Sequence, residues 1–380
     1  MTFLAIVLFL FWCYQGSLFM AAVFWRVPRL TPGAASLTAY PKVSIIFAAR
    51  NEEQKIRDAV CTMLNQDYPD FEVIAVNDRS SDQTLAILED LARTPQASRL
   101  KVFDIQKLPA NWLGKNHALY QGFLASSGEW LLFTDADVHF DPGTLKAALQ
   151  TVSERKLDHL VLFPYAITKS YLEALFMMTF TFVFYLWFRP WAARNPRSQA
   201  YVGIGSFNLV RREVYEKIGT HQAIALEVTD DMMLGREVKK HGFRQMLMDG
   251  TSMIWETWVE GWKGILNSLE KNGFAGLHYN LFLLIGATLG LLIFDMAPFF
   301  LIFVTHGGAQ YCLLGVIGIF FLMHCAVQKY FRYSLITFPA HPFGSLLILF
   351  LVWRSAVKTL WQGGVKWRDT FYPLEILKKK

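Results

Sequence analysis

An almost continuous apolar run over residues 2–25 limits how this chain can fold. A membrane-spanning helix needs about 20 apolar residues, and the run lacks both the basic start and the small-residue cleavage site of a secretory signal. We therefore interpret residues 1–27 as an N-terminal transmembrane anchor. Because Arg26, Arg29 and Lys42 follow the run and no basic residue precedes it, the positive-inside rule predicts that the next segment is cytoplasmic.

The composition fits a membrane protein that also carries a folded α/β domain. The chain is 53% hydrophobic and 18% charged, which is too apolar for a soluble protein and too charged for a bundle of membrane helices alone. Its 380 residues leave room for one such domain and several membrane segments. Many Lys and Arg residues lie beside apolar runs, where lipid headgroups are their natural partners, so we expect no nucleic-acid partner.

Short apolar runs alternate with amphipathic, helix-like stretches from Lys42 to about Tyr165. This alternation indicates βαβ units and a mainly parallel sheet. Polar residues follow three of the apolar runs, at residues 50–53, 77–82 and 135–137. Ligands of such sheets bind beyond the carboxyl ends of the strands. We therefore expect an α/β catalytic domain over residues 42–252, with its site at that edge.

A second apolar stretch, residues 171–188, is flanked by charged residues. It is long enough to be taken for another crossing, but a crossing would separate residues 135–137 from the acidic residues 230–231. If these groups share one site, the stretch cannot span the membrane. We predict an interfacial or buried helix there.

The C-terminal third returns to the membrane. Residues 255–277 are rich in Trp and Lys and are predicted to form an amphipathic helix at headgroup depth; an ordinary helix packed on the domain is the alternative. Residues 278–358 form the predicted C-terminal transmembrane region, and residues 359–380 a basic tail. Either three crossings place this tail outside, or two crossings and a re-entrant or surface segment over 343–353 keep it inside. We favour the second arrangement, because the tail is basic.

The segment TDAD, with Asp135 and Asp137, ends an apolar strand-like run. Two carboxylates at a strand end can hold a hard cation that bridges phosphate oxygens and neutralises charge on a diphosphate leaving group. The alternative is a surface turn that caps the helix beginning near Asp141.

Three further segments end at the same expected edge. Glu52 lies in the first loop and Asp78 in the second, where each can also serve as a helix-terminal carboxylate. In WLGKNHAL, Lys115 follows a glycine and precedes a helix, an arrangement that can bind phosphate; a solvated lysine is the alternative.

Taken in order, these loops resemble the family 2 glycosyltransferases, which have a GT-A fold, over most of residues 43–250. The resemblance implies a nucleotide-diphosphate sugar donor. It also implies that Asp78 contacts the base and that Ala49 and Glu52 lie by the nucleoside.

By the same resemblance, Asp135 and Asp137 bind the ribose and a divalent cation, Mg²⁺ or Mn²⁺, with Asp137 the better candidate for the metal. Lys115 is assigned to the donor.

The segment YVGIGSFNLVRREVYEKIGT resembles the acceptor side of such enzymes. The candidates there and in the Trp-rich stretch are Gly203, Gly205, Ser206, Arg211, Trp258 and Trp262.

The TDD of EVTDDMMLGREVKKHG stands where the family has an acidic pair, which makes Asp230 and Asp231 catalytic candidates and Asp231 the base. An acceptor hydroxyl is a poor nucleophile, so a carboxylate must take its proton as it attacks the anomeric carbon. A single displacement inverts that carbon. The alternative is an acidic first turn of a helix.

No QxxRW element, which marks the processive polysaccharide synthases of this family, follows Asp231. The anchor, the stretch over 171–188 and the tail segment VKWRDTFY look more like the branch that glycosylates hopanoids, carotenoids or ceramide-type lipids. The expectation is an integral protein of the cell membrane with a cytoplasmic catalytic domain. It would transfer a sugar, from a UDP-sugar by preference, to a lipid-like acceptor, inverting and non-processive. Transfer to polyisoprenyl phosphate or a short polysaccharide stays open, as does a non-catalytic scaffold or transport protein.

Overall fold

The computed structural model describes residues 1–31, 39–94, 98–367 and 370–378. The chain forms two compact units. The sheet unit consists of Pro28–Ile167 and Arg189–Thr257, and the helical unit consists of Met1–Val27, Thr168–Phe188 and Trp258–Lys380. Of the predicted basic tail, Arg368, Lys379 and Lys380 lie outside the described residues.

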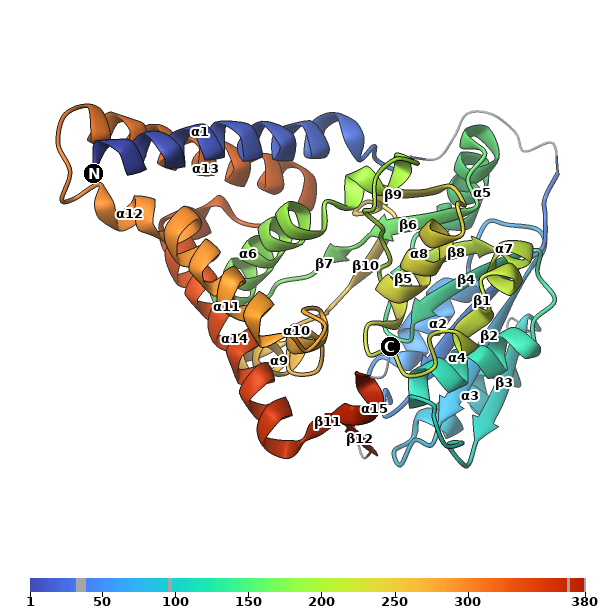
Figure 1. The fold of residues 1–380 in the computed structure, drawn as a ribbon. Helices are drawn as coiled ribbons and strands as arrows, with labels where there is room; N and C mark the ends of the chain where they lie inside the picture. Colours follow the sequence, from blue (N-terminus) through green and yellow to red (C-terminus); the bar gives the residue numbers. More distant parts are fainter. Residues whose placement is uncertain (32–38, 95–97, 368–369, 379–380) are drawn as a thin grey trace. The chain divides into compact units, whose positions relative to one another are not determined.

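A seven-stranded sheet forms the centre of the sheet unit (Figure 1). Its order is β3-β2-β1-β4-β8-β6-β9, and among these described strands only β8 runs antiparallel to its neighbours. The strands are β1 (Val43–Ala49), β2 (Phe71–Asp78), β3 (Leu100–Ile105), β4 (Trp130–Asp135), β6 (His159–Phe163), β8 (Asn208–Arg211) and β9 (Gln245–Asp249). The predicted α/β class with a mainly parallel sheet is confirmed.

Both faces of this sheet are buried, which explains why its strands are continuous apolar runs. Ile45 and Phe47 of β1 belong to one hydrophobic core, whereas Ile46 between them belongs to the other. Three helices contribute to the first core, namely α2 (Ile56–Leu64), α3 (Thr84–Ala92) and α5 (Thr144–Arg155). Three contribute to the second, namely α4 (Gly114–Leu124), α7 (Arg212–Lys217) and α8 (Asp230–Lys240).

The carboxyl ends of three neighbouring strands define the edge at which ligands are expected. β1 lies between β2 and β4 and is parallel to both, and the three strands end at Ala49, Asp78 and Asp135. The chain passes outward from β1 through β2 to β3 and returns to the other side of β1 at β4. Such a switch in strand order opens a crevice beyond the strand ends.

A small second sheet continues from this edge. It has the order β5-β10-β7, from β5 (His139–Phe140), β10 (Ile254–Glu256) and β7 (Tyr165–Ala166). β5 follows directly on Asp137, and Trp255 of β10 pairs with His139. The end of the sheet unit is thereby tied to the acidic loop after β4.

Five segments of the described residues are long and apolar enough to cross a membrane. They lie in the helical unit, except that the end of the second segment, from Arg189 on, belongs to the sheet unit. They are Thr2–Arg26, Tyr171–Arg194, Leu281–Leu301, Gly308–Phe331 and Leu335–Gln362. The principal helices in them are α1 (Thr2–Ala21), α6 (Tyr171–Phe188), α11 (Leu281–Gly290), α12 (Ala297–Leu301), α13 (Gly308–Phe331) and α14 (His341–Gln362). Large apolar side chains such as Phe3 and Phe282 are more than four-fifths exposed, which is typical of a lipid-facing surface.

The first and fourth segments pack side by side in the same direction. Trp12 of α1 lies against Phe320 of α13, with ring centroids 4.3 Å apart, and further along both helices Phe24 meets Tyr330. Figure 1 shows the two helices adjacent at one edge of the helical unit. The C-terminal ends of α1 and α13 therefore lie together.

One expectation needs correction. The single amphipathic helix predicted over 255–277 is instead the end of β10, followed by the two short helices α9 (Gly261–Ser268) and α10 (Asn272–Ala275). Residues 254–256 form a strand that pairs with β5 and β7, because strand partners distant in sequence outweigh local helical periodicity. The short third run over 343–353 lies inside the 22-residue helix α14.

Candidate active site

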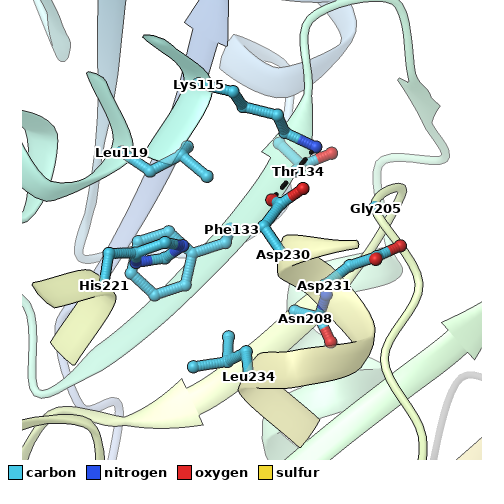
Figure 2. A pocket seen from close by; sticks show the side chains of 10 residues that line it. All are labelled: Lys115, Leu119, Phe133, Thr134, Gly205, Asn208, His221, Asp230, Asp231 and Leu234. Carbon is cyan, nitrogen blue, oxygen red and sulfur yellow. Dashed lines mark ion pairs between the residues drawn. The ribbon is translucent and has the colours of Figure 1, made fainter. Parts of the chain in front are cut away.

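A lysine joins the two acidic segments that lie about a hundred residues apart. Lys115 lies in the first turn of α4, and its Nζ lies 2.8 Å from Oδ1 of Asp135 and 3.3 Å from Oδ2 of Asp230. Figure 2 shows the ammonium between α4 and the start of α8. The carboxylate after β4 and the carboxylate that opens α8 thus occupy one place in the sheet unit.

Asp230 and Asp231 form the first turn of α8, where the positive end of the helix favours carboxylates. Their side chains point to different sides (Figure 2): Asp230 reaches Lys115, and Oδ1 of Asp231 accepts a hydrogen bond from the backbone N–H of Met232 at 2.7 Å. A Cβ on Gly203 would collide with the backbone carbonyl of Asp231. Glycine is therefore required for the close approach of residues 202–205 to this turn.

The electrostatics of this cluster favour a base and a cation side by side. Burial, followed by the neighbouring charge of Asp230, raises the pKa of Asp231 to about 6. Burial lowers the pKa of Lys115, but Asp135 and Asp230 outweigh it and leave that pKa above its ordinary value. Lys115 is thus charged at neutral pH. The carboxyl group of Asp231 can gain or lose a proton at a pH close to neutral.

A second lysine contacts the other member of the DxD. Nζ of Lys55 lies 3.3 Å from Oδ2 of Asp137 and 3.3 Å from the carbonyl oxygen of Thr257. Burial and the charge of Asp135 raise the pKa of Asp137, against the opposing field of Lys55. Lys55 was not singled out from the sequence, because a lysine just before a helix is usually exposed to solvent.

The sequence also gave no indication of Glu256, a buried carboxylate at the end of β10. Its side chain is hydrogen bonded with Ser206, and burial, Asp137 and Asp135 raise its pKa to about 8. Glu256 lies 119 residues beyond Asp137 in the chain and belongs to no short motif. Only the pairing of β10 with β5 brings it to the DxD.

The donor set at this edge fits a hard divalent cation. Asp135 and Asp137 offer carboxylate oxygens, which Mg²⁺ and Mn²⁺ prefer, and each already has a cationic Nζ as neighbour. Across the described residues, no three His, Cys, Asp or Glu side chains are arranged closely enough to enclose an ion by themselves. A cation would therefore be held by the two aspartates together with groups of its substrate.

Asp78, the predicted base-contacting residue, ends β2 and is buried. Its Oδ1 accepts a hydrogen bond from Nε of Arg79 at 2.7 Å, and Arg50 lies 3.7 Å from Oδ2. The pair presents a carboxylate and a guanidinium next to each other. Such a pair can match the adjacent N–H and C=O groups on the edge of a base.

The loops after β1 and β2 hold one another in place. The backbone N–H of Glu52 donates to Oγ1 of Thr84 at 2.8 Å, and that of Glu53 donates to Oδ2 of Asp82 at 3.1 Å. Ala49, the last residue of β1, is fully buried and pairs with Asn77. Both loops predicted to lie by the nucleoside are thus at the expected edge.

The acceptor-side candidates are divided. Gly205 lies against Asp135, where a Cβ would collide with Oδ2, and the carbonyl oxygen of Ser206 accepts a hydrogen bond from Thr134. Arg211 pairs with Trp130 at the start of β4, which places it roughly 16 Å along the strand from Asp135. It is not brought to the cluster.

The two tryptophans on the acceptor side, Trp258 and Trp262, belong to the helical unit. Trp258 packs on Phe176 and Phe180 of α6, whereas Trp262 is 51% exposed. Their roles stay predictions.

A small pocket lies beneath the acidic pair. Its lining residues are Lys115, Leu119, Phe133, Thr134, Gly205, Asn208, His221, Asp230, Asp231 and Leu234 (Figure 2). His221 is buried, its Nδ1 lies 2.6 Å from the hydroxyl of Tyr215, and burial followed by the charge of Lys115 lowers its pKa to about 3. A neutral imidazole therefore forms part of the wall behind Asp230.

The sheet order, the strand-end aspartates and the acidic helix start agree with the GT-A-like fold expected from the sequence. Residues 44–219, which include most of the sheet unit, match the model of Glycosyl transferase family 2.

Two relatives illustrate the match. A 4,4'-diaponeurosporenoate glycosyltransferase of Staphylococcus aureus strain USA300 is 26% identical over 235 residues, and the alignment covers 60% of this chain and 60% of the relative's own length. A mannosyltransferase of Pyrobaculum calidifontis, solved with GDP-mannose and Mn²⁺, superposes with a TM-score of 0.57 at 17% identity and covers 95% of this chain and 99% of its own. The second likeness concerns the fold alone.

Proposed function

We propose that the protein is an inverting, non-processive glycosyltransferase that moves a sugar from a nucleotide-diphosphate sugar, a UDP-sugar by preference, to a lipid-like acceptor. One observation carries the proposal. Lys115 contacts Asp135 and Asp230 together, so donor-binding and catalytic carboxylates of the predicted kind converge on one cluster. The match of residues 44–219 to Glycosyl transferase family 2 supports the reaction class.

The residues of this cluster have distinct tasks in the proposed reaction. Asp231 takes the proton of the acceptor hydroxyl, and Asp230 orients Lys115, whose charge attracts the diphosphate. Asp78 with Arg79 selects the base. A divalent cation at Asp135 and Asp137 neutralises the charge that develops on the diphosphate as it leaves.

The lipid-like acceptor is supported by two observations. The Staphylococcus aureus relative is named for a carotenoid acid, and the helical unit exposes large apolar side chains along several helices. The alternative, transfer to polyisoprenyl phosphate or a short polysaccharide, predicts a product with a phosphate link or with several sugars.

We further propose that the sheet unit lies on the cytoplasmic face of the cell membrane. The basic residues after the first apolar run support this side. Residues 28–167 and 189–257 form one compact unit, so α6 between them cannot be a single crossing that would leave its ends on opposite sides.

Contacts of the neighbouring helices support the re-entrant or surface arrangement predicted for residues 343–353, taken here together with residues 332–342 before them. α13 ends beside the C-terminal end of α1, which leads into the sheet unit. Arg354 and Lys358 of α14 contact Glu270, which follows the sheet unit by few residues. Both ends of 332–353 thus lie on the side of the sheet unit, and the basic tail with them.

Labelling tests this topology. In a variant without native cysteines, Tyr311→Cys at the start of α13 should react with a membrane-impermeant maleimide from one side of the vesicle and Trp361→Cys from the other. Both side chains are more than two-thirds exposed. Reaction of the two from the same side contradicts the re-entrant arrangement.

The catalytic proposal is tested with purified protein in lipid nanodiscs, Mn²⁺, a panel of UDP- and GDP-sugars and apolar alcohol or acid acceptors. Mass spectrometry should find one sugar added to an apolar acceptor from one donor class. Asp137→Asn should abolish that product, whereas Asp90→Asn, an exposed carboxylate paired with Arg57, should not. Full activity of Asp137→Asn overturns the proposal.

A further inference from the structure

Glu256 is a buried ionisable group of the sheet unit that the proposed reaction does not use. It is 8% exposed and lies at the end of β10, in register with Ala166 of β7. A buried carboxylate is costly unless a charge or hydrogen-bond partners compensate it. Its position therefore calls for a compensating group.

The surroundings of Glu256 point to the DxD. Trp255 pairs with His139, two residues after Asp137, and their rings stack at 5.8 Å. On the other side, Nζ of Lys55 contacts both Thr257 and Asp137 at 3.3 Å. The residues before and after Glu256 are thus each held against the acidic loop.

The third link runs through the acceptor-side loop. The side chain of Glu256 is hydrogen bonded with Ser206, and the preceding Gly205 lies against Oδ2 of Asp135. Contacts from three directions hold residues 255–257 against the DxD, and the Glu256 carboxylate interacts electrostatically with Asp137 and Asp135. Three carboxylates at one place repel one another in the absence of matching positive charge, and a dication supplies such charge.

We infer that Glu256 is a positioning residue of the cation site, whose negative charge strengthens the binding of a divalent cation at Asp135 and Asp137 without touching the ion. The inference rests on the proposed function, because that function places the cation there. Outer carboxylates of this kind commonly change metal affinity by about 10- to 100-fold.

The test measures Mn²⁺ binding by electron paramagnetic resonance of the protein in detergent, with no donor present and at a pH above 8, where the Glu256 carboxyl group is ionised. Glu256→Gln keeps the shape and a hydrogen-bonding group but removes the charge, and it should weaken Mn²⁺ binding by about 10- to 100-fold. Glu256→Asp keeps the charge and should restore binding to within about threefold of the wild type.

Glu72 offers a matched control. It is a buried glutamate of the same unit, bonded to Ser44 at 2.7 Å, but it lies near the start of β2, at the far end of that strand from Asp78. Glu72→Gln should leave Mn²⁺ affinity unchanged. Equal losses in Glu72→Gln and Glu256→Gln would show a general loss of structure and overturn the inference.

Ser206→Ala distinguishes the effect of the Glu256 charge from the effect of its hydrogen bond to Ser206. It also tests the role of Glu256 if Glu256→Gln does not fold. It removes the hydrogen-bond partner and leaves the charge, so Mn²⁺ affinity should stay within about threefold of the wild type. A loss as large as that expected for Glu256→Gln would mean that Glu256 only braces the loop. Wild-type affinity in folded Glu256→Gln overturns the inference as well.

Asp137→Asn distinguishes a failure of the role inferred for Glu256 from a failure of the proposed cation site. If it loses Mn²⁺ binding while Glu256→Gln keeps it, the role of Glu256 is wrong and the proposed function stands. If Asp137→Asn binds Mn²⁺ like the wild type, the cation site of the proposed function is itself wrong.

Discussion

The sheet unit and the helical unit surround their buried carboxylates differently. At the edge of the sheet, Asp230 faces the ammonium of Lys115 at 3.3 Å and lines a pocket. Inside the helical unit, Asp295 is bonded to His341 and Ser345 in a region where Phe299 and Phe320 pack on His341.

The difference teaches what each group is suited to do. A carboxylate that meets a lysine beside a pocket can exchange that partner for a substrate or an ion. A carboxylate whose hydrogen-bond partners lie on another helix fixes helix positions. The carboxylates at the sheet edge, such as Asp231, should therefore affect turnover, and Asp295 should affect stability.

The largest expected effect is on turnover. Asp231→Asn removes the proposed base, so kcat should fall by about 10²- to 10⁴-fold, while the melting temperature stays close to that of the wild type. Sugar transfer to the acceptor is the measurement. A variant that loses both turnover and folding would show that Asp231 acts as a structural carboxylate, and the contrast between the units would break.

A smaller effect is expected for the enclosed carboxylate. Asp295→Ala leaves His341 and Ser345 buried without their partner, which should cost about 1–3 kcal/mol of stability. Unfolding in mixed micelles with rising SDS measures it. Asp295→Asn keeps an acceptor and should lose less. Unchanged stability in Asp295→Ala would mean that the polar contact between these helices contributes nothing.

The pH dependence sharpens the same contrast. Since burial and Asp230 raise the pKa of Asp231 to about 6 and the base must be ionised, kcat/KM should rise with pH up to that value. Below it, the rate should fall about tenfold per unit. Initial rates between pH 5 and 8 measure the profile, with tight buffering of Mn²⁺ as the control. A rate that does not change over this range argues against Asp231 as the base.

The smallest effect is expected at the partly exposed ion cluster of the helical unit. Glu270 pairs with Arg354 at 2.6 Å and also with Lys358, and side chains that are about a third exposed gain little from such pairs. Glu270→Gln should cost at most about 1 kcal/mol in the same SDS titration. A loss of stability as large as that of Asp295→Ala would mean that the buried and the partly exposed carboxylates of the helical unit do not differ in this respect.

Much of the site was accessible from the sequence because its parts lie at strand ends. Asp78 and Asp135 close apolar runs, and period and length alone identify such runs as buried strands. Parallel pairing then places their ends at one edge. The structure brings Asp230 into contact with Lys115 at this edge, whereas Arg211 ends a strand that runs the other way.

The sequence by itself determined the class of fold and the long apolar segments, because periodicity and apolar length are local properties. Only the tertiary structure decided that Lys55 and Glu256 face the DxD, that residues 254–256 form a strand and that α14 begins beside Asp295. These features depend on contacts between residues far apart in the chain, which local pattern does not encode. The physical reason is that the burial of a side chain and the charges near it depend on its neighbours in space, which can be far away in the sequence.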